Sequence, residues 1–322
     1  MTGHGDGKVA QRLERLTGAG VRELRLTGSQ HQSRHYRAAL ADGRIVFVKA
    51  AAAGLGAALR AEARGLGWLG EAAAVPVPDV IGCDESMLVI SWIPAGAADP
   101  AAAGRFGRDL ALMHAAGADR FGAPWPGFIA SLPLPNDGPA AGQDARAGPE
   151  GTPVDPAGPE GAPGDRAGPE GVGAWPDWYA SRRLLPFLRT AVDAGALRPA
   201  QARDVETVVA RIGELAGPAE PPSRIHGDCW SGNVLWSGGR GWLIDPAAHG
   251  GHRETDLAML ALFGAPFLDQ ILTGYAEVAS LAAGWRDRVP LHQLHPLLVH
   301  ACLFGAGYAG PVADAARAAL AS

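Results

Sequence analysis

Hydrophobic and polar residues alternate over Val21–Leu26, with the period of two that is typical of a half-buried β-strand, and a strand is predicted there. Two further strands are expected at Arg34–Leu40 and Arg44–Lys49. The Asp42-Gly43 pair between the last two favours a tight hairpin turn. Two further apolar strands are expected around an acidic turn, at Val80–Cys83 and Met87–Ile93.

Most of the remaining elements are expected to be helices. In the first part, helices are expected at Val9–Leu16 and Leu55–Leu69. After Pro94 we expect a series of helices at Ala101–Ala116, Trp178–Ala194, Ala200–Ala216, Thr255–Phe263, Pro266–Leu281 and Leu291–Phe304. Two short strands interrupt this series, near Val234–Trp236 and Trp242–Ile244. The pattern predicts an α+β chain of two lobes, a small β-rich lobe over 1–93 and a larger helical lobe over 94–322, with a ligand cleft between them.

One segment of the chain, 137–173, is not expected to fold. Glycine and proline supply 17 of its 37 residues, and the sequence AGPEG recurs every ten residues. Such a composition offers too little apolar surface to offset the entropy lost on ordering. We therefore predict a flexible acidic insertion in the helical lobe.

Composition narrows the classes of partner. The 137–173 segment carries seven acidic residues and two arginines, which accounts for the whole formal net charge of −5 of the 322-residue chain. A neutral body without a basic run argues against nucleic acid or an anionic membrane as the main partner. The three scattered cysteines suit neither a disulfide framework nor a four-cysteine zinc site. With no signal-like start and no long apolar run, a cytoplasmic protein is expected.

The densest group of polar residues lies between Arg224 and Pro246. Asp228 and Asn233 stand five residues apart across a glycine-containing loop, and Asp245 ends an apolar strand. Two carboxylates and an amide on adjoining loops suit metal-assisted phosphoryl transfer, in which one carboxylate accepts the hydroxyl proton and the other oxygens hold Mg²⁺. Because aspartate and asparagine are also ordinary turn residues, this spacing alone leaves a chance occurrence open.

A second indication comes from lysine usage. Only two of the 28 basic residues are lysines, Lys8 and Lys49. Lys49 closes the apolar strand Ile45–Val48, where a buried cation needs a partner. Its compact charge suits nucleotide phosphates, with Glu62 of the next helix as an ion-pair partner, although a strand-end lysine that extends into water has the same pattern.

Three other features favour structural roles. We interpret His292, His295 and His300 as residues on the faces of a helix rather than as metal ligands, since no acidic cluster joins them in the sequence. Cys229 is expected to be a buried thiol. We expect His226 to brace its loop by hydrogen bonds to backbone carbonyls.

With these residues in view, the chain resembles the fructosamine (ketosamine) kinases, a branch of the aminoglycoside-phosphotransferase-like and protein-kinase-like fold. The resemblance rests on H-G-D-x-W-x-G-N at 226–233, on Asp245-Pro246-Ala247, and on G-x-R-E-x-D-L-A-M at 251–259. It covers nearly the whole chain except 137–173. It implies an ATP- and Mg²⁺-dependent kinase that phosphorylates a sugar hydroxyl on a free or protein-bound glycated amine, which leads to deglycation.

The resemblance also implies a role for individual residues. Asp228 would be the catalytic base, Asn233 and Asp245 the Mg²⁺ ligands, and Lys49 with Glu62 the pair that meets the ATP phosphates. Further nucleotide contacts are implied at Gly28, Ser29, Ser91, Trp92 and Ile93. Contacts near the acceptor, or bracing of the loop, are implied for Trp230, His249, Arg253, Glu254 and Asp256.

The chain departs from the family pattern at three places. The phosphate loop over 28–33 has one glycine, Ser91 stands where an acidic residue is usual, and His249 replaces an aromatic residue. Arg253 and Asp256 could equally form a structural ion pair. Two other functions stay open, a kinase of an aminoglycoside or amino alcohol and a nucleotide-binding pseudokinase that serves as an interaction module.

Overall fold

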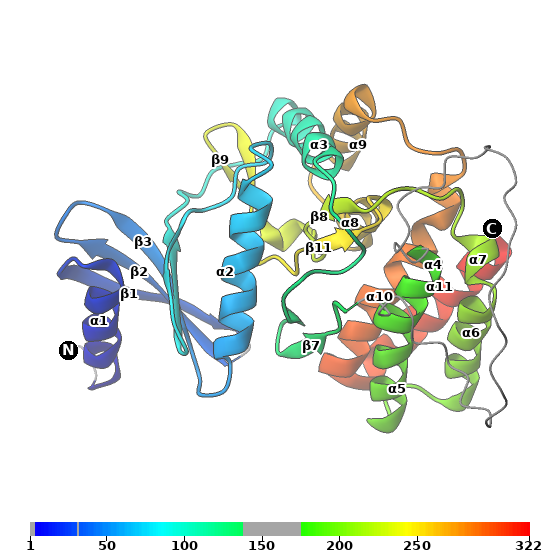
Figure 1. Ribbon diagram of the computed structural model, residues 1–322, viewed down its shortest axis with the longest axis horizontal. Helices are drawn as coiled ribbons and strands as arrows, with labels where there is room; N and C mark the ends of the chain where they lie inside the picture. The colour runs from blue at the N-terminus through cyan, green and yellow to red at the C-terminus, as the bar shows by residue number, and fades with distance from the viewer. Residues whose placement is uncertain (1–3, 31, 138–174) are drawn as a thin grey trace, which may run out of the picture.

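The computed structural model describes residues 4–30, 32–137 and 175–322. They form a sheet-rich N-terminal part and a helical C-terminal part (Figure 1). The N-terminal part is one antiparallel sheet with strand order β1-β2-β3-β5-β4. Its strands are β1 (Val21–Gln30), β2 (Ser33–Leu40), β3 (Ile45–Ala51), β4 (Val80–Cys83) and β5 (Met87–Ser91).

Two helices cover the two faces of this sheet, α1 (His4–Thr17) and α2 (Gly56–Gly70) (Figure 1). Strand alternation explains which residue meets which helix. Val46 and Val48 pack in the cluster that holds Leu13 of α1, whereas Phe47 packs in the cluster built on α2. Lys49 shares the face of Phe47, so its side chain points toward α2 and the helical part.

The predicted hairpin is confirmed. β2 and β3 pair from Ser33 with Ala51 to Ala39 with Ile45. Between them, Gly43 has φ +91° and Leu40 N donates to Arg44 O at 2.9 Å. A positive φ is the conformation that glycine adopts without a steric penalty, which is why Asp-Gly marks this turn.

The C-terminal part holds most of the helices. They are α3 (Pro100–Ala115), α4 (Trp175–Tyr179), the π-helix η1 (Ala180–Leu184), α5 (Leu185–Asp193), α6 (Pro199–Ala210), α7 (Ile212–Leu215), the 3-10 turn η2 (Ser231–Asn233), α8 (Glu254–Leu262), α9 (Leu268–Val278), α10 (Trp285–Phe304), the 3-10 turn η3 (Gly305–Tyr308) and α11 (Ala309–Ala321). Three antiparallel strand pairs lie among them: β6 (Gly127–Ile129) with β7 (Leu132–Leu134), β8 (Ser223–Ile225) with β11 (His249–Gly251), and β9 (Val234–Ser237) with β10 (Arg240–Leu243).

Several predicted helices differ from the observed ones. The single helix expected over Trp178–Ala194 is α4, η1 and α5 in succession, because Pro186 lacks the N–H that a continuous helix needs. The helix expected over Ala200–Ala216 is divided at Arg211 into α6 and α7. α10 begins six residues earlier than expected and contains two prolines. α11 and the three-residue strands were not predicted.

α10 is the core helix of the C-terminal part, and ten of its residues are buried. The stretch Trp285–Ala321 is long and apolar enough to cross a membrane by length and composition alone. Its buried apolar residues, among them Leu291, Leu294 and Leu298, join the main core cluster together with Trp175, Leu184 and Val205. The apolar character of this stretch therefore reflects packing inside the lobe.

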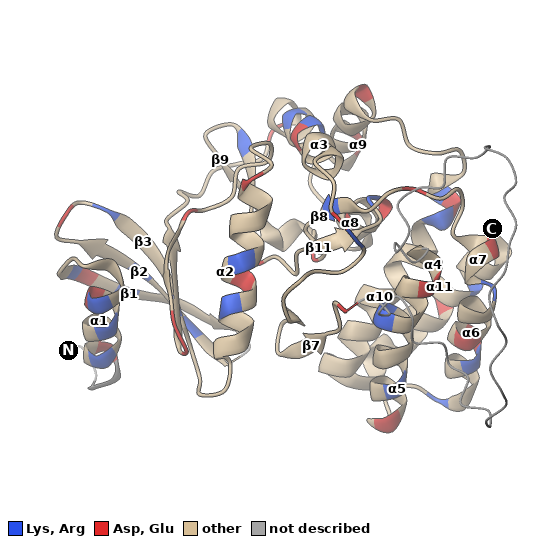
Figure 2. Ribbon diagram, viewed as in Figure 1, with Lys and Arg blue, Asp and Glu red and all other residues tan. Residues whose placement is uncertain are grey.

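The chain passes from the sheet-rich part to the helical part after β5. α3 begins beyond the connection, where Asp99 caps it by accepting from Ala102 N at 2.8 Å. The boundary between 93 and 94 stays a prediction. Residues 138–173 of the expected flexible segment lie outside the described residues. Figure 2 shows basic and acidic positions interspersed over both parts.

Candidate active site

A cavity of about 790 Å³ lies between the sheet-rich part and the helical part. Its size is that of a typical small-molecule or cofactor site. Nine of the residues predicted from sequence line it: Lys49, Glu62, Ser91, Trp92, Ile93, Asp228, Trp230, Asn233 and Asp245. Residues 196 positions apart in the chain are thus brought to one place.

Lys49 is the cation of this cavity's inner wall. Its Nζ donates to Glu62 of α2 at 2.9 and 2.7 Å, and it also contacts Asp245 Oδ1. Its side chain is only 11% exposed, so the strand-end lysine does not extend into water. Burial opposes the charge, but the two carboxylates outweigh burial and raise the pKa of Lys49 above its ordinary value.

The two carboxylates share one ammonium, and their pKa values move apart. Burial, together with the charge of Asp245, raises the pKa of Glu62 to about 8. Burial would also raise the pKa of Asp245, but Lys49 lowers it to about 2. Asp245 has φ +54°, an uncommon conformation that aspartate tolerates better than most residues. The result is an ionised carboxylate at the cavity wall beside a fixed cation.

Asp228 and Asn233 face each other across the loop after β8. Asn233 Nδ2 donates to Asp228 O at 2.9 Å and to Asp228 Oδ2 at 3.0 Å. Burial first, and the charge of Asp245 second, raise the pKa of Asp228 to about 7. A carboxylate with a pKa near neutrality can accept a proton during a reaction.

Two buried residues hold this loop in place. Asp256 of α8 accepts from His226 N at 2.7 Å and from Gly227 N at 2.9 Å. The His226 ring pairs with Ile244 O at 2.9 Å, which confirms its predicted bracing role. Asp256 therefore supports the loop through two backbone N–H groups. The alternative ion pair between Asp256 and Arg253 does not form, because Arg253 pairs with Glu220. Cys229 is fully buried, as expected.

Part of the cavity lining is an aromatic wall. Its members line the cavity and form a chain of ring contacts 4.9–6.0 Å between centroids, made by Trp230, Phe263, His300, Phe304 and Tyr308. Gly232 permits the Trp230 position, because a Cβ there would lie 2.2 Å from the indole ring. Phe263 and Phe304 are 41% and 56% exposed, so an apolar face stays open to a ligand.

Six residues with implied contacts do not line the cavity: Gly28, Ser29, His249, Arg253, Glu254 and Asp256. Gly28 and Ser29 are exposed and belong to β1, where they pair with His35 and Arg34 of β2. The predicted phosphate loop is thus strand rather than loop at these positions. Of its neighbours, Gln30 and Ser33 do line the cavity.

His249 also lies away from the cavity. It is buried, its Nδ1 pairs with Ala247 O at 2.7 Å, and its ring contacts Trp178 at 5.5 Å. Burial, and then the charge of Arg183, hold its pKa well below the ordinary value. A neutral, enclosed imidazole of this kind is a packing residue, so we withdraw the acceptor role predicted for it.

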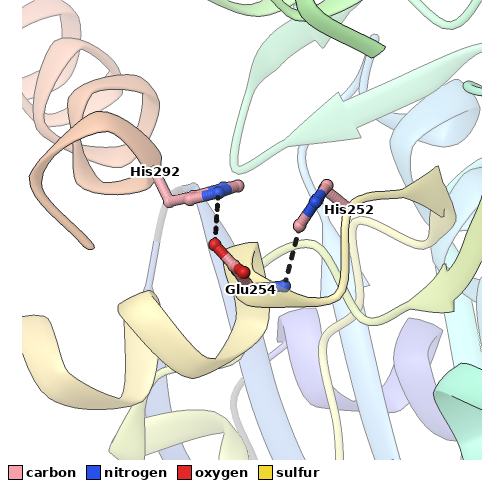
Figure 3. A group of neighbouring side chains, drawn as sticks. All are labelled: His252, Glu254 and His292. Carbon is pink, nitrogen blue, oxygen red and sulfur yellow. Dashed lines mark hydrogen bonds and ion pairs between the residues drawn. The ribbon is translucent and has the colours of Figure 1, made fainter. Parts of the chain in front are cut away.

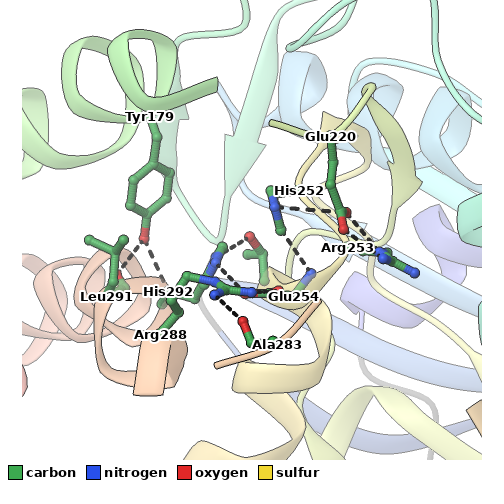
Figure 4. A network of polar contacts seen from close by, with 10 residues as sticks. Tyr179, Glu220, His252, Arg253, Glu254, Ala283, Arg288, Leu291 and His292 are labelled. Carbon is green, nitrogen blue, oxygen red and sulfur yellow. Dashed lines mark hydrogen bonds and ion pairs between the residues drawn. The ribbon is translucent and has the colours of Figure 1, made fainter. Parts of the chain in front are cut away.

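Arg253 and Glu254 are occupied by other partners (Figure 4). Arg253 donates to both oxygens of Glu220, at 2.7 and 2.6 Å. Glu254 is 1% exposed and accepts from Arg288 Nε at 2.9 Å and Nη2 at 2.5 Å. Neither Arg253 nor Glu254 lines the cavity, and both are held in ion pairs, so their contacts favour the bracing alternative over an acceptor contact.

Glu254 also meets two histidines, His252 and His292 (Figure 3). Their ligand-type atoms lie within 4.8 Å of one another, so an acidic residue does join His292, contrary to expectation. Burial lowers the pKa of both rings, that of His252 to about 3. Because Arg288 neutralises both oxygens of Glu254, a metal ion here would lie beside a guanidinium. We therefore assign this group to the structure of the lobe.

Two features of the cavity were not predicted from the sequence. His35 lines it from β2, directly across from Lys49 in the strand register. The aromatic residues at 300, 304 and 308 recur every four positions, and this spacing places them on one face where α10 passes into η3. That spacing could have identified the aromatic wall.

Comparison with known proteins gives a consistent picture. The profile of the fructosamine kinase family matches residues 8–140 and 171–322. A solved Thermobifida fusca structure, a candidate fructosamine-3-kinase, is 48% identical, with a TM-score of 0.85 and coverage of 98% of this chain and 99% of that one. A candidate ketoamine kinase from Synechocystis sp. is 29% identical over 93% of this chain and 92% of its own length.

More distant structures share the fold alone. A choline kinase from Streptococcus pneumoniae has a TM-score of 0.63 at 14% identity, with 99% of this chain and all of that chain covered. The architecture is thus the bilobal protein-kinase-like fold predicted from sequence. With the family profile matched on both sides of the Gly/Pro-rich segment, the chain belongs to the fructosamine kinase family of phosphotransferases.

Proposed function

We propose that this protein transfers the γ-phosphoryl group of ATP, with Mg²⁺, to a sugar hydroxyl of a ketosamine. The observation that carries the proposal is the convergence of Lys49, Asp228, Asn233 and Asp245 on one cavity. Phosphoryl transfer requires little covalent work from a protein, so positioned oxygens and cations are sufficient.

The nucleotide half of the cavity fits a magnesium nucleotide. Asn233 Oδ1 and the Asp245 carboxylate would hold Mg²⁺, which prefers oxygen ligands and would neutralise the phosphate charge. Asn233 uses its amide nitrogen for Asp228, which leaves its oxygen for a cation. Lys49 would meet the phosphates, and Glu62 would hold it in position. The residues Ser91 to Ile93 would border the adenine.

In the acceptor half, Asp228 would orient and deprotonate the attacking hydroxyl. The aromatic wall offers faces on which a sugar and a single ammonium group can stack. The only carboxylates among the described cavity residues are Glu62, Asp228 and Asp245. A polycationic aminoglycoside would find no further acidic partner there, which favours a ketosamine over the aminoglycoside alternative.

The family resemblance extends this proposal to a biological role. Phosphorylation of a ketosamine in this family gives an unstable product that releases the amine, so we propose that the enzyme acts in deglycation. A cytoplasmic location stays a prediction. The intact set of Lys49, Asp228, Asn233 and Asp245 argues against a pseudokinase.

A coupled ADP-release assay with Mg²⁺ tests the proposed acceptor. We expect turnover with fructosyl-lysine or ribulosyl-lysine to exceed turnover with an aminoglycoside or choline by at least about tenfold, because the aromatic wall carries no added carboxylates. Preference for the aminoglycoside or for choline would overturn the ketosamine assignment. ATP binding without ADP release from any of these compounds would favour the pseudokinase.

A further inference from the structure

We propose that a second, small cavity in the helical part binds a single chloride ion. The cavity lies behind the catalytic loop, and its walls include Trp178, Arg183, His249 and His295 together with Gly227 of the loop. Its volume is about 10 Å³. That space holds one water-sized or monatomic occupant and excludes phosphate or sulfate.

The walls of this cavity carry unused hydrogen-bond donors. Among the described residues, five buried side-chain nitrogens lack a hydrogen-bond partner, and three of them belong to residues of this wall. They are Trp178 Nε1, Arg183 Nε and His295 Nε2. The first two can only donate, and buried donors are normally satisfied by a protein group or a bound species.

Among the residues that the structure describes, none balances the charge at this site. Arg183 is 1% exposed, and its guanidinium lies over the Trp178 ring at 4.2 Å. Its other nitrogens donate to neutral oxygens only, those of Pro135, Arg182 and Asn136. Within the described ranges no carboxylate forms an ion pair with it. A buried charge without a counter-charge is costly.

An anion satisfies this environment better than a water molecule does. A water molecule is neutral and would leave the Arg183 charge unbalanced, whereas a chloride ion would balance that charge and would accept from Arg183 Nε and Trp178 Nε1. The cavity wall has three histidines, His249, His252 and His295, and burial lowers the pKa of each. Burial, followed by the charge of Arg183, holds the pKa of His295 well below its ordinary value, so Arg183 remains the charge to be balanced.

Binding at this point would join separate segments of the lobe. Trp178 comes from α4, Arg183 from η1, His295 from α10 and His249 from β11. One ion in contact with their donors would connect these elements beside the catalytic loop. Its expected effect is on stability, and no catalytic step is assigned to it.

Thermal unfolding of the full-length protein tests this proposal. Melting temperatures are compared in potassium chloride and in potassium gluconate at equal ionic strength. We expect chloride to raise the melting temperature by about 2 °C once its concentration exceeds its dissociation constant about tenfold, because it binds only the folded chain. The Arg183→Met variant should lose this response. The exposed Arg189→Met variant, from the same helical region, should keep it.

A second variant and a direct measurement cover the case in which Arg183→Met does not fold. Trp178→Phe removes one donor and keeps an aromatic ring over Arg183, so it should weaken the chloride response without abolishing folding. Crystals of the parent protein in bromide should show an anomalous peak within contact of Arg183 Nε and Trp178 Nε1. Identical melting in chloride and gluconate, or bromide found only on the protein surface, would overturn the proposal.

Discussion

Replacing Asp228 by asparagine is expected to lower kcat by about 10²–10⁴ while ATP binding persists. The asparagine side chain cannot take the proton of the acceptor hydroxyl. Its carbonyl oxygen can still accept from Asn233 Nδ2, which now meets Asp228 Oδ2 at 3.0 Å, so the loop should keep its conformation. Steady-state ADP release gives kcat, and calorimetric titration gives the dissociation constant of the magnesium nucleotide.

A surface variant provides the control for this experiment. Asp269→Asn makes the same chemical change at an exposed position of α9 and should leave kcat unchanged. A turnover of Asp228→Asn within about tenfold of the parent would contradict the assignment of Asp228 as the base.

Replacing Glu254 by glutamine is expected to lower the free energy of unfolding by about 3–5 kcal/mol. The change leaves the Arg288 guanidinium, whose side chain is 9% exposed, without its counter-charge. Because Glu254 and Asp256 share the first turn of α8, the loop held by Asp256 should also loosen. Equilibrium denaturation in urea measures the change.

Two further variants separate charge loss from a general effect of the substitution. Glu214→Gln breaks an exposed pair with Arg211 and should cost about 1 kcal/mol or less. Adding Arg288→Met to Glu254→Gln removes the unpaired charge and should recover part of the lost stability. A loss for Glu254→Gln no larger than that for Glu214→Gln would show that the buried pair does not stabilise the lobe.

The sequence predicted well those elements whose pattern is local. The apolar run Ile45–Val48 and the Asp42-Gly43 turn predicted the strand that ends at Lys49 and its hairpin pairing. Elements that depend on tertiary packing escaped prediction. The three-residue strands are too short to show a period, and the π-helix at Ala180–Leu184 depends on Pro186 and on the burial of Arg183.

The part of the candidate site that consists of motif residues was predicted from the sequence. Lys49, Asp228, Asn233 and Asp245 do meet in one cavity. The ion-pair partners could not be predicted from local sequence, because they lie far away in the chain. Arg253 pairs with Glu220, 33 residues earlier, and Glu254 pairs with Arg288, 34 residues later. Nothing in the local sequence of Arg253 or Glu254 indicates these contacts. The acceptor contacts were therefore expected only because both residues belong to the motif at 251–259.

The most direct test of the central claim is a crystal structure with Mg²⁺ and a non-hydrolysable ATP analogue. The account predicts a cation about 2.0–2.1 Å from oxygens of Asn233 and Asp245, with Lys49 Nζ on the phosphates and the γ-phosphate facing Asp228. A nucleotide bound outside this cavity, or a cation held without Asn233 and Asp245, would contradict it.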